Sequence, residues 1–376
     1  MGFSTNEDHE SVRRNVRSFL AKSGTEADVR RIMESEPGHD VVGWAKLCSE
    51  LGVAAIGIPE ELGGAGFGFA ELAVVLEELG AALYPSPLFA SRVLAAEALI
   101  RSGDETVADA VAALAGGETI GCLALSEDTG TWQADRISVT ATPVGDGYAL
   151  KGRASFVVDG AVADLVVVVA DLAGEPSLFH VRSGAEGLER EPLQTVDLTR
   201  RQARLTFDGC IARLVGSPGT APRVVDSVLD LAAIALAAEQ VGGAQRCLDL
   251  AVDHAKNRIQ FGRPIGSFQA IKHKCANVLL ELDAARSAAR TAAWSVDNAP
   301  DDIPVLASVA KAHCSEMYEL AARECIQIHG GMGFTWEFAA QLYFKRAYSS
   351  ALMFGTPDHH REALARRLGL GTRSVA

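Results

Sequence analysis

The stretch RIQFGRPIGSFQ, residues 258–269, interrupts two long helix-forming runs of alanine, leucine and charged residues. Gly262 and Pro264 are of the types that commonly separate helices, so the stretch is first of all a candidate turn between two helices. Arg258, Phe261 and Gln269 surround that turn. Their chemistry suggests a binding site at one end of a helix pair, and the rest of the chain has to decide between the two interpretations.

Composition limits the class of protein. The chain has 376 residues, of which 48% are hydrophobic and 22% charged, which is typical of a globular protein with two or three core-forming units. Its formal net charge of -13 disfavours nucleic acid and anionic membranes as partners. No run approaches the ~20 apolar residues of a membrane span, and the polar start MGFSTNEDHE is unlike a signal peptide. We therefore expect a soluble, cytoplasmic protein.

The seven cysteines are scattered and odd in number. None forms a CxxC pair or another metal-ligand spacing, so reduced thiols are expected and no metal site is predicted. The sequence Asp358-His359-His360 is the one cluster that suggests metal or acid–base chemistry. A solvated helix start explains it better, because no third ligand has a suitable spacing.

The period of the hydrophobic pattern changes twice along the chain, which predicts an α+β protein with three domains. Residues 1–117 read as an N-terminal helical domain. Residues 118–218 contain short β-rich runs such as ADLVVVVADL, separated by glycine-containing turns, and predict a middle antiparallel β-domain that forms a barrel or a sandwich. Residues 219–376 return to helical spacing and predict a C-terminal four-helix bundle.

A second unusual segment lies within the predicted bundle. QIHGGMGF, residues 327–334, ends the third bundle helix and has glycines at 330, 331 and 333. Glycine lets a ligand approach the backbone closely, an arginine fork suits phosphate, and an aromatic ring stacks on a planar cofactor. Two such segments in one bundle favour a dinucleotide site over a plain turn. No G-x-G-x-x-G follows a predicted strand, so a Rossmann site is unsupported.

These segments resemble the acyl-CoA dehydrogenase family along nearly the whole chain. LGVAAIGIPEELGGAGFGFAELAVVLEELG (51–80) resembles its N-terminal helical domain, NRIQFGRPIGSFQAIKH (257–273) its bundle signature, and QIHGGMGFTWE (327–337) its glycine loop. The resemblance implies that one chain holds the adenine-dinucleotide half of an FAD that is bound mainly by the neighbouring subunit. The residues that it assigns to this role are Arg258, Phe261, Gln269, Gln327, Gly330 and Gly331.

The same resemblance assigns a second set of residues to the flavin bound by the chain itself, namely Leu125, Ser126, Phe156, Val158 and Thr356. Here the sequence departs from the family pattern. The Thr-Glu-Pro-x-x-Gly-Ser-Asp segment of the family corresponds to the shorter Ser126–Thr131, and its Trp-Ile-Thr to Phe156–Val158. The resemblance therefore implies one intact half-site and one weak half-site.

The catalytic base of the family is also missing from both of its usual positions. Where many members carry Tyr-Glu-Gly-Thr, this chain has MFGT, with Phe354 at the carboxylate position. The alternative position, near the start of the helix before the signature, is Ala232. Glu239 lies seven residues further along that helix and is the remaining candidate for the base. A buried ion pair or a wall of the acyl pocket is the better-supported role for Glu239, since an unpaired buried charge is costly.

Three functions stay open on these residues. The first is an FAD-dependent acyl-CoA dehydrogenase, or a subunit of one, that desaturates an acyl-CoA thioester between its α and β carbons. The second is a non-catalytic subunit that supplies the ADP half of the FAD site to a catalytic partner. The third is a flavin-dependent monooxygenase on the same fold. The assembly is then either a homotetramer or an α2β2 heterotetramer with another acyl-CoA dehydrogenase-like chain.

Overall fold

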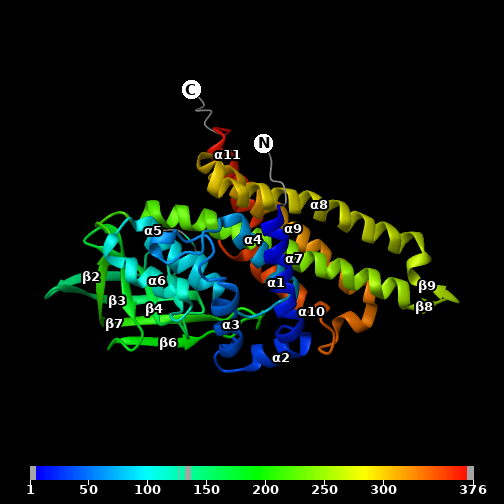
Figure 1. The fold of residues 1–376 in the computed structure, drawn as a ribbon, viewed down its shortest axis with the longest axis horizontal. Coiled ribbons are helices and arrows are strands. Elements are labelled where there is room, and N and C mark those ends of the chain that lie inside the picture. Colours follow the sequence, from blue (N-terminus) through cyan, green and yellow to red (C-terminus); the bar gives the residue numbers. More distant parts are fainter. Residues whose placement is uncertain (1–5, 126, 131, 133–136, 371–376) are drawn as a thin grey trace. The chain divides into compact units, whose positions relative to one another are not determined.

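The computed structural model describes residues 6–125, 127–130, 132 and 137–370. Helices come first, strands follow between Gly121 and Val215, and helices return from Ala221 (Figure 1). This order confirms the expected fold class. The chain forms two compact units, residues 1–30, 69–84 and 233–376 in the first and residues 31–68 and 85–232 in the second. We call them the bundle unit and the β unit.

The helices and strands have the following bounds. The helices before the strands are α1 (Glu7–Ser23), α2 (Glu26–Glu34), α3 (Val41–Leu51), η1 (Glu60–Leu62), α4 (Phe69–Ala82), η2 (Phe89–Ala96), α5 (Glu97–Ser102), η3 (Glu105–Val107) and α6 (Ala108–Gly116). The strands are β1 (Gly121–Ala124), β2 (Val139–Val144), β3 (Gly147–Val158), β4 (Leu165–Leu172), β5 (Glu175–Arg182), β6 (Leu188–Pro192) and β7 (Gln202–Val215). The elements after them are α7 (Ala221–Asn257), β8 (Ile259–Gln260), β9 (Arg263–Pro264), η4 (Ile265–Ser267), α8 (Gln269–Asn298), η5 (Pro300–Asp302), α9 (Ile303–His329), η6 (Gly330–Phe334), α10 (Ala340–Leu352) and α11 (Pro357–Arg367).

The strands of the β unit form a sheet that closes on itself. Strand β4 pairs with β2, β2 with β3, β3 with β7, β7 with β5, and β5 again with β4. Most pairings are antiparallel, as expected, but β1 and β2 each pair with β4 in parallel. Strand β4 has neighbours on both edges and buries six consecutive residues, Leu165–Ala170. A continuous apolar run is what a strand covered on both faces requires.

The bundle unit is built from long helices that run side by side in Figure 1. Helix α9 packs against α8, α10 and α11, and α8 packs against α4. Helix α8 buries Val278, Leu282 and Ala285, which recur at helical spacing in its middle. Helix α8 begins at Gln269, with Phe268 at the N-cap position, and Ser267 belongs to the η4 turn.

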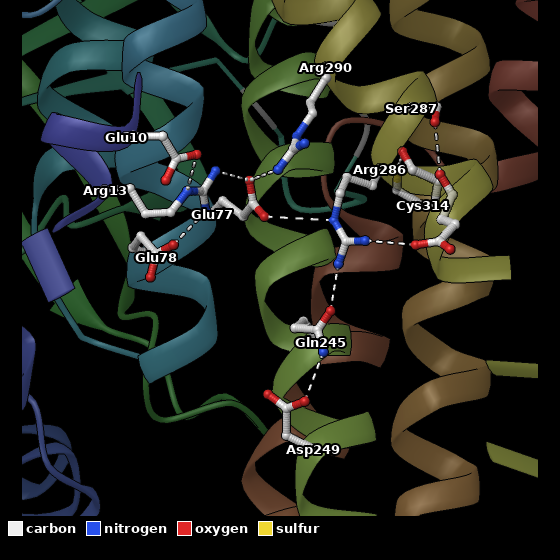
Figure 2. A network of polar contacts seen from close by, with 12 residues as sticks. Glu10, Arg13, Glu77, Glu78, Gln245, Asp249, Arg286, Ser287, Arg290 and Cys314 are labelled. Carbon is white, nitrogen blue, oxygen red and sulfur yellow. Dashed lines mark hydrogen bonds and ion pairs between the residues drawn. The ribbon is translucent and has the colours of Figure 1, made fainter. Parts of the chain in front are cut away.

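A network of charged side chains joins α1, α4, α7 and α8 inside the bundle unit (Figure 2). Arg13 Nη1 lies 2.6 Å from Glu78 Oε1 and Arg13 Nη2 lies 3.2 Å from Glu77 Oε2. Glu77 also faces Arg290 at 3.6 Å and Arg286 at 4.0 Å. Since the side chains of Arg13 and Glu78 are both less than 10% exposed, their charges depend on one another for solvation.

Candidate functional site

The stretch that follows α7 forms a two-residue hairpin turn. Strand β8 pairs with β9, and the turn residues Phe261 and Gly262 have φ angles of 53° and 74°. Two successive positive φ angles are typical of a type I′ turn. A bulky residue with positive φ is strained, and such strain occurs often at binding sites.

The side chain of Phe261 lies outside the core, although it is large and apolar. It is 90% exposed, and its ring meets the Phe268 ring edge-on at a centroid distance of 6.0 Å. The guanidinium of Arg263 covers Phe268 at 4.1 Å. An exposed aromatic ring supported from behind by a second ring is suited to stack on a planar ligand.

Arg258 and Gln269 flank this hairpin and are both exposed. Arg258 directly follows the last residue of α7, and Gln269 is the first residue of α8. Among the described residues no carboxylate forms an ion pair with Arg258. Its guanidinium group is therefore available for an anion from outside the chain.

The glycine loop begins where α9 ends. Gln327 lies in the last turn of α9 and is exposed. Gly330 has a φ angle of 62°, and a Cβ atom added to Gly330 or Gly331 would meet nothing within 4 Å. These glycines do not make room for neighbouring protein atoms. They leave the backbone open to a ligand.

The structure brings the hairpin and the glycine loop to the same end of the bundle. His254, in the last turn of α7, stacks on His329 with ring centroids 4.2 Å apart, and Phe338 covers His329 at 4.3 Å. His329 Nδ1 donates to the carbonyl oxygen of Cys325 at 2.7 Å. His329 thus satisfies a backbone carbonyl in the last turn of α9. Burial acts against the charge of His329, but its hydrogen bonds to Cys325 raise its pKa.

The second set of candidate residues lies mostly in the β unit. Leu125 follows β1 and is buried, and Phe156 and Val158 lie on β3. Phe156 has a φ angle of 58°, and its ring lies next to the backbone of Gly130. Ser126 lies outside the described residues. Thr356 belongs to the bundle unit, where its hydroxyl accepts a hydrogen bond from the His359 backbone at 3.2 Å and caps α11.

Neither usual base position carries an acid in the folded chain. Phe354 lies in the turn between α10 and α11, with a φ angle of 58°, and its side chain is buried. Ala232 is buried within α7. The structure thus keeps a sharply bent backbone at position 354 but places a hydrocarbon ring there.

Glu239 forms a buried ion pair with Arg346. Glu239 Oε1 lies 2.6 Å from Arg346 Nη1, and the two side chains are 6% and 5% exposed. Helix α4 approaches the backbone of Glu239 closely because residue 80 is a glycine, since a Cβ on Gly80 would come within 2.2 Å of the Glu239 carbonyl oxygen. A buried ion pair is one of the two roles that the sequence favoured for this residue, the other being a wall of the acyl pocket. Its partner Arg346 was not identified from the sequence.

Asp358, His359 and His360 lie at the start of α11, as predicted, with Asp358 and His359 exposed. His360 is buried, and its Nε2 donates to the Phe354 carbonyl at 2.9 Å, while Asp358 pairs with Arg361. Asp358, His359 and His360 are therefore not a shared site. In the basic run DLTRRQAR (197–204), Arg201 donates to the Met33 and Ser35 carbonyls, and Arg204 pairs with Glu191.

Lys311 is a further buried charged residue that the sequence analysis missed. It lies in α9 with its side chain 0% exposed. The signal was available, because Ala307, Lys311 and Tyr318 recur at helical spacing on the buried face of that helix. A lysine within an apolar stripe indicates a specific partner.

Comparisons with known proteins agree with this arrangement. The family model described as the N-terminal domain of acyl-CoA dehydrogenase matches residues 6–118, and the C-terminal domain model matches residues 222–369. The acyl-CoA dehydrogenase IpdE2 of Mycobacterium tuberculosis is 40% identical over 361 residues, which cover 96% of each chain.

Two solved structures extend the match. The ChsE4–ChsE5 complex from Mycobacterium tuberculosis contains a chain with a TM-score of 0.89 and 29% identity, covering 98% of this chain and 99% of that one. The Tcur3481–Tcur3483 steroid acyl-CoA dehydrogenase, a G363A variant, gives a TM-score of 0.86 and 30% identity over the same shares. The chain therefore belongs to the acyl-CoA dehydrogenase family of flavoproteins, oxidoreductases that act on CH–CH donors.

Proposed function

We propose that this chain provides the adenine-dinucleotide half of an FAD site to a neighbouring subunit, within an enzyme that desaturates an acyl-CoA thioester. The observation that carries the proposal is a contrast between two sets of residues. The six side chains or backbones assigned to the neighbour's FAD are exposed at one end of the bundle, whereas Phe354 and Ala232 leave both usual base positions without a carboxylate.

The residues of the exposed set fit the chemistry of a dinucleotide. Arg258 has a guanidinium free for a pyrophosphate, and Phe261 presents a ring to a base or to the edge of a planar group. Gln269 and Gln327 provide amide donors and acceptors. Gly330 and Gly331 let the ligand reach backbone N–H groups, because no side chain covers them. When bound, the flavin supplies the acceptor for the hydride that leaves the β-carbon.

The proposed enzyme is a mixed α2β2 tetramer in which the partner supplies the base. In a closed assembly of identical subunits each chain must provide every group that a site needs. Phe354 and Ala232 provide no acid, and Glu239 is held by Arg346. A partner that carries the family's carboxylate would complete the site. The two-component names ChsE4–ChsE5 and Tcur3481–Tcur3483 support such a pairing.

The proposed substrate class is an acyl-CoA thioester, as for the acyl-CoA dehydrogenase family. The Tcur3481–Tcur3483 protein is named a steroid acyl-CoA dehydrogenase. Steroid-derived acyl-CoA thioesters are therefore the first class to offer to the assembled protein, with straight-chain thioesters as the comparison.

Native mass spectrometry tests the assembly directly. The chain is expressed alone and together with a second acyl-CoA dehydrogenase-like chain that carries the carboxylate. We expect two chains of each kind and two flavins in the co-expressed protein. Flavin binding only to the assembled state should also raise the yield of soluble yellow protein. A homotetramer of this chain alone that holds four FAD and oxidises acyl-CoA would overturn the proposal.

A further inference from the structure

Lys311 is a fully buried lysine whose ammonium group is held by neutral oxygen atoms. Its Nζ donates to the Ser315 hydroxyl at 3.0 Å, to the Gly355 carbonyl at 3.1 Å and to the Ala351 carbonyl at 3.2 Å. In the described part of the chain it forms no ion pair. An ammonium group has three N–H donors, so these three acceptors match it completely. A neutral amine has only two donors and would leave one acceptor unpaired.

Two of the three acceptors belong to the segment that carries position 354. Ala351 lies in the last turn of α10, where carbonyl groups lack partners within the helix. Gly355 lies in the α10–α11 turn, which we define as residues 353–356. His360, from α11, donates to the preceding carbonyl of this turn, that of Phe354, at 2.9 Å. Two buried side chains thus hold two successive carbonyl groups.

The α10–α11 turn has a conformation that requires such support. Phe354 and Gly355 have φ angles of 58° and 104°. The first is costly for an aromatic residue, and conformations of this kind persist only where the surroundings enforce them. A Cβ at position 355 would lie 2.6 Å from a ring carbon of His359. The turn therefore depends on contacts made by α9 and α11.

We propose that Lys311 is a positioning residue whose ammonium group holds the α10–α11 turn, and with it the side chain at position 354 and the hydroxyl of Thr356. The backbone of the turn has this strained conformation although residue 354 is a phenylalanine and not an acid. The part of the inference that concerns Thr356 and the flavin rests on the proposed function. The part that concerns the turn depends on the bonds to Ala351 and Gly355 alone.

The remaining contacts of Lys311 belong to a buried polar strip that does not touch the turn. Gln240 Nε2, from α7, donates to the hydroxyls of Ser315 and Ser350 at 3.0 and 3.1 Å. Ser350 also donates to the Ala347 carbonyl within α10. Ser350 is therefore a matched control, because its loss disturbs the same core without removing a bond to the turn.

Burial makes the charge of Lys311 sensitive to pH. Its pKa is lowered to about 7 by burial, against the fields of Cys314 and Glu319 on its own helix. From α11 it faces His359 and His360, whose pKa values are themselves lowered. Gln240, from α7, carries no charge. Raising the pH through about 7 should therefore remove one donor and loosen the turn.

Hydrogen exchange of the full chain without flavin tests the inference. The backbone amides of His359 and His360 report on the turn, since they donate to the Thr356 hydroxyl and carbonyl at 3.2 and 3.1 Å. In Lys311→Met their protection factors should fall about ten- to a hundredfold, as expected for losing a hydrogen bond from a charged donor. In Ser350→Ala they should stay at the wild-type value.

The wild-type protein provides the second measurement, which is independent of whether Lys311→Met folds. The protection factors of the same amides, corrected for intrinsic exchange, should be lower at pH 9 than at pH 6. Equal protection in Lys311→Met and Ser350→Ala, or protection in the wild type that does not change with pH, would overturn the inference. Because no flavin is present, a failure of the proposed FAD site leaves this result unaffected.

Discussion

Glu239 on α7 and Arg346 on α10 form an ion pair in the core of the bundle unit, with 2.6 Å between Oε1 and Nη1. The two residues are 107 positions apart in the sequence. Each is almost completely removed from water, so each depends on the other for the solvation of its charge. The pair connects two helices of the bundle, and it engages the carboxylate that the sequence analysis considered as an alternative base.

Breaking this pair should destabilise the chain. Glu239→Gln leaves the Arg346 charge buried without its counterion, which costs about 3 to 5 kcal/mol. The double variant Glu239→Leu/Arg346→Met should recover much of that loss, because it leaves no unpaired charge. Urea unfolding followed by circular dichroism measures both. A single variant as stable as the wild type would show that the pair contributes nothing to folding.

The same substitution tests Glu239 as a base. Under the proposed function, Glu239→Gln in the co-expressed assembly should keep its flavin and reduce it anaerobically with acyl-CoA at close to the wild-type rate. The base then lies on the partner. Retained flavin and thioester binding with no flavin reduction would instead assign proton abstraction to Glu239.

Arg258→Ala should release FAD and leave the chain folded. Arg258 is exposed and unpaired within the described chain, so its removal costs no internal contact. A charge-assisted bond to pyrophosphate is worth about 1.5 to 3 kcal/mol, or roughly ten- to a hundredfold in affinity. Flavin absorbance of the purified assembly and the unfolding midpoint of the chain are the two readouts. Lys256→Ala, an exposed cation two residues earlier, is the control, and equal flavin content in both variants would contradict the assignment.

Glu77 should matter more for stability than Glu10, although both face Arg13. Glu77 is 14% exposed and lies within 4.0 Å of three arginines, so Glu77→Gln should cost about 3 kcal/mol. Glu10 is 58% exposed and 3.9 Å from Arg13, and Glu10→Gln should change stability by less than about 0.5 kcal/mol. Chemical denaturation of both variants gives the comparison. Similar losses would mean that burial of the network in Figure 2 is energetically unimportant.

His360 should make the chain sensitive to acid. Burial, with the charge of Lys311, lowers the pKa of His360 from 6.5 to about 3. The unfolded chain therefore binds a proton that the folded chain does not, and stability is lost as the pH falls below 6.5 towards 3. Between pH 6.5 and 5 this amounts to about 2 kcal/mol, at about 1.4 kcal/mol per pH unit. His360→Gln should lose less stability than the wild type over this range in urea titrations, and an equal loss in the two proteins would contradict the prediction.

Much of the fold could be predicted from local pattern. The change from helical to alternating spacing and back identified the order of the elements, because side-chain periodicity is a property of consecutive residues. The closure of the sheet and the parallel pairings of β1 and β2 with β4 were not predictable in this way. Strand pairing depends on which strands meet in space. The residue pattern within one strand does not determine which strands become its neighbours.

For the site, the sequence by itself determined which functional groups are present. It identified Arg258, Phe261 and the two glycines as a group suited to a dinucleotide, and it showed that Phe354 and Ala232 are not acids. Tertiary structure alone decided the partners: Arg346 for Glu239, His254 for His329, and the Gly355 carbonyl for Lys311. The physical reason is that a buried charge or a bent turn is stabilised by contacts between helices that are distant in sequence, and only the packed core brings those groups together.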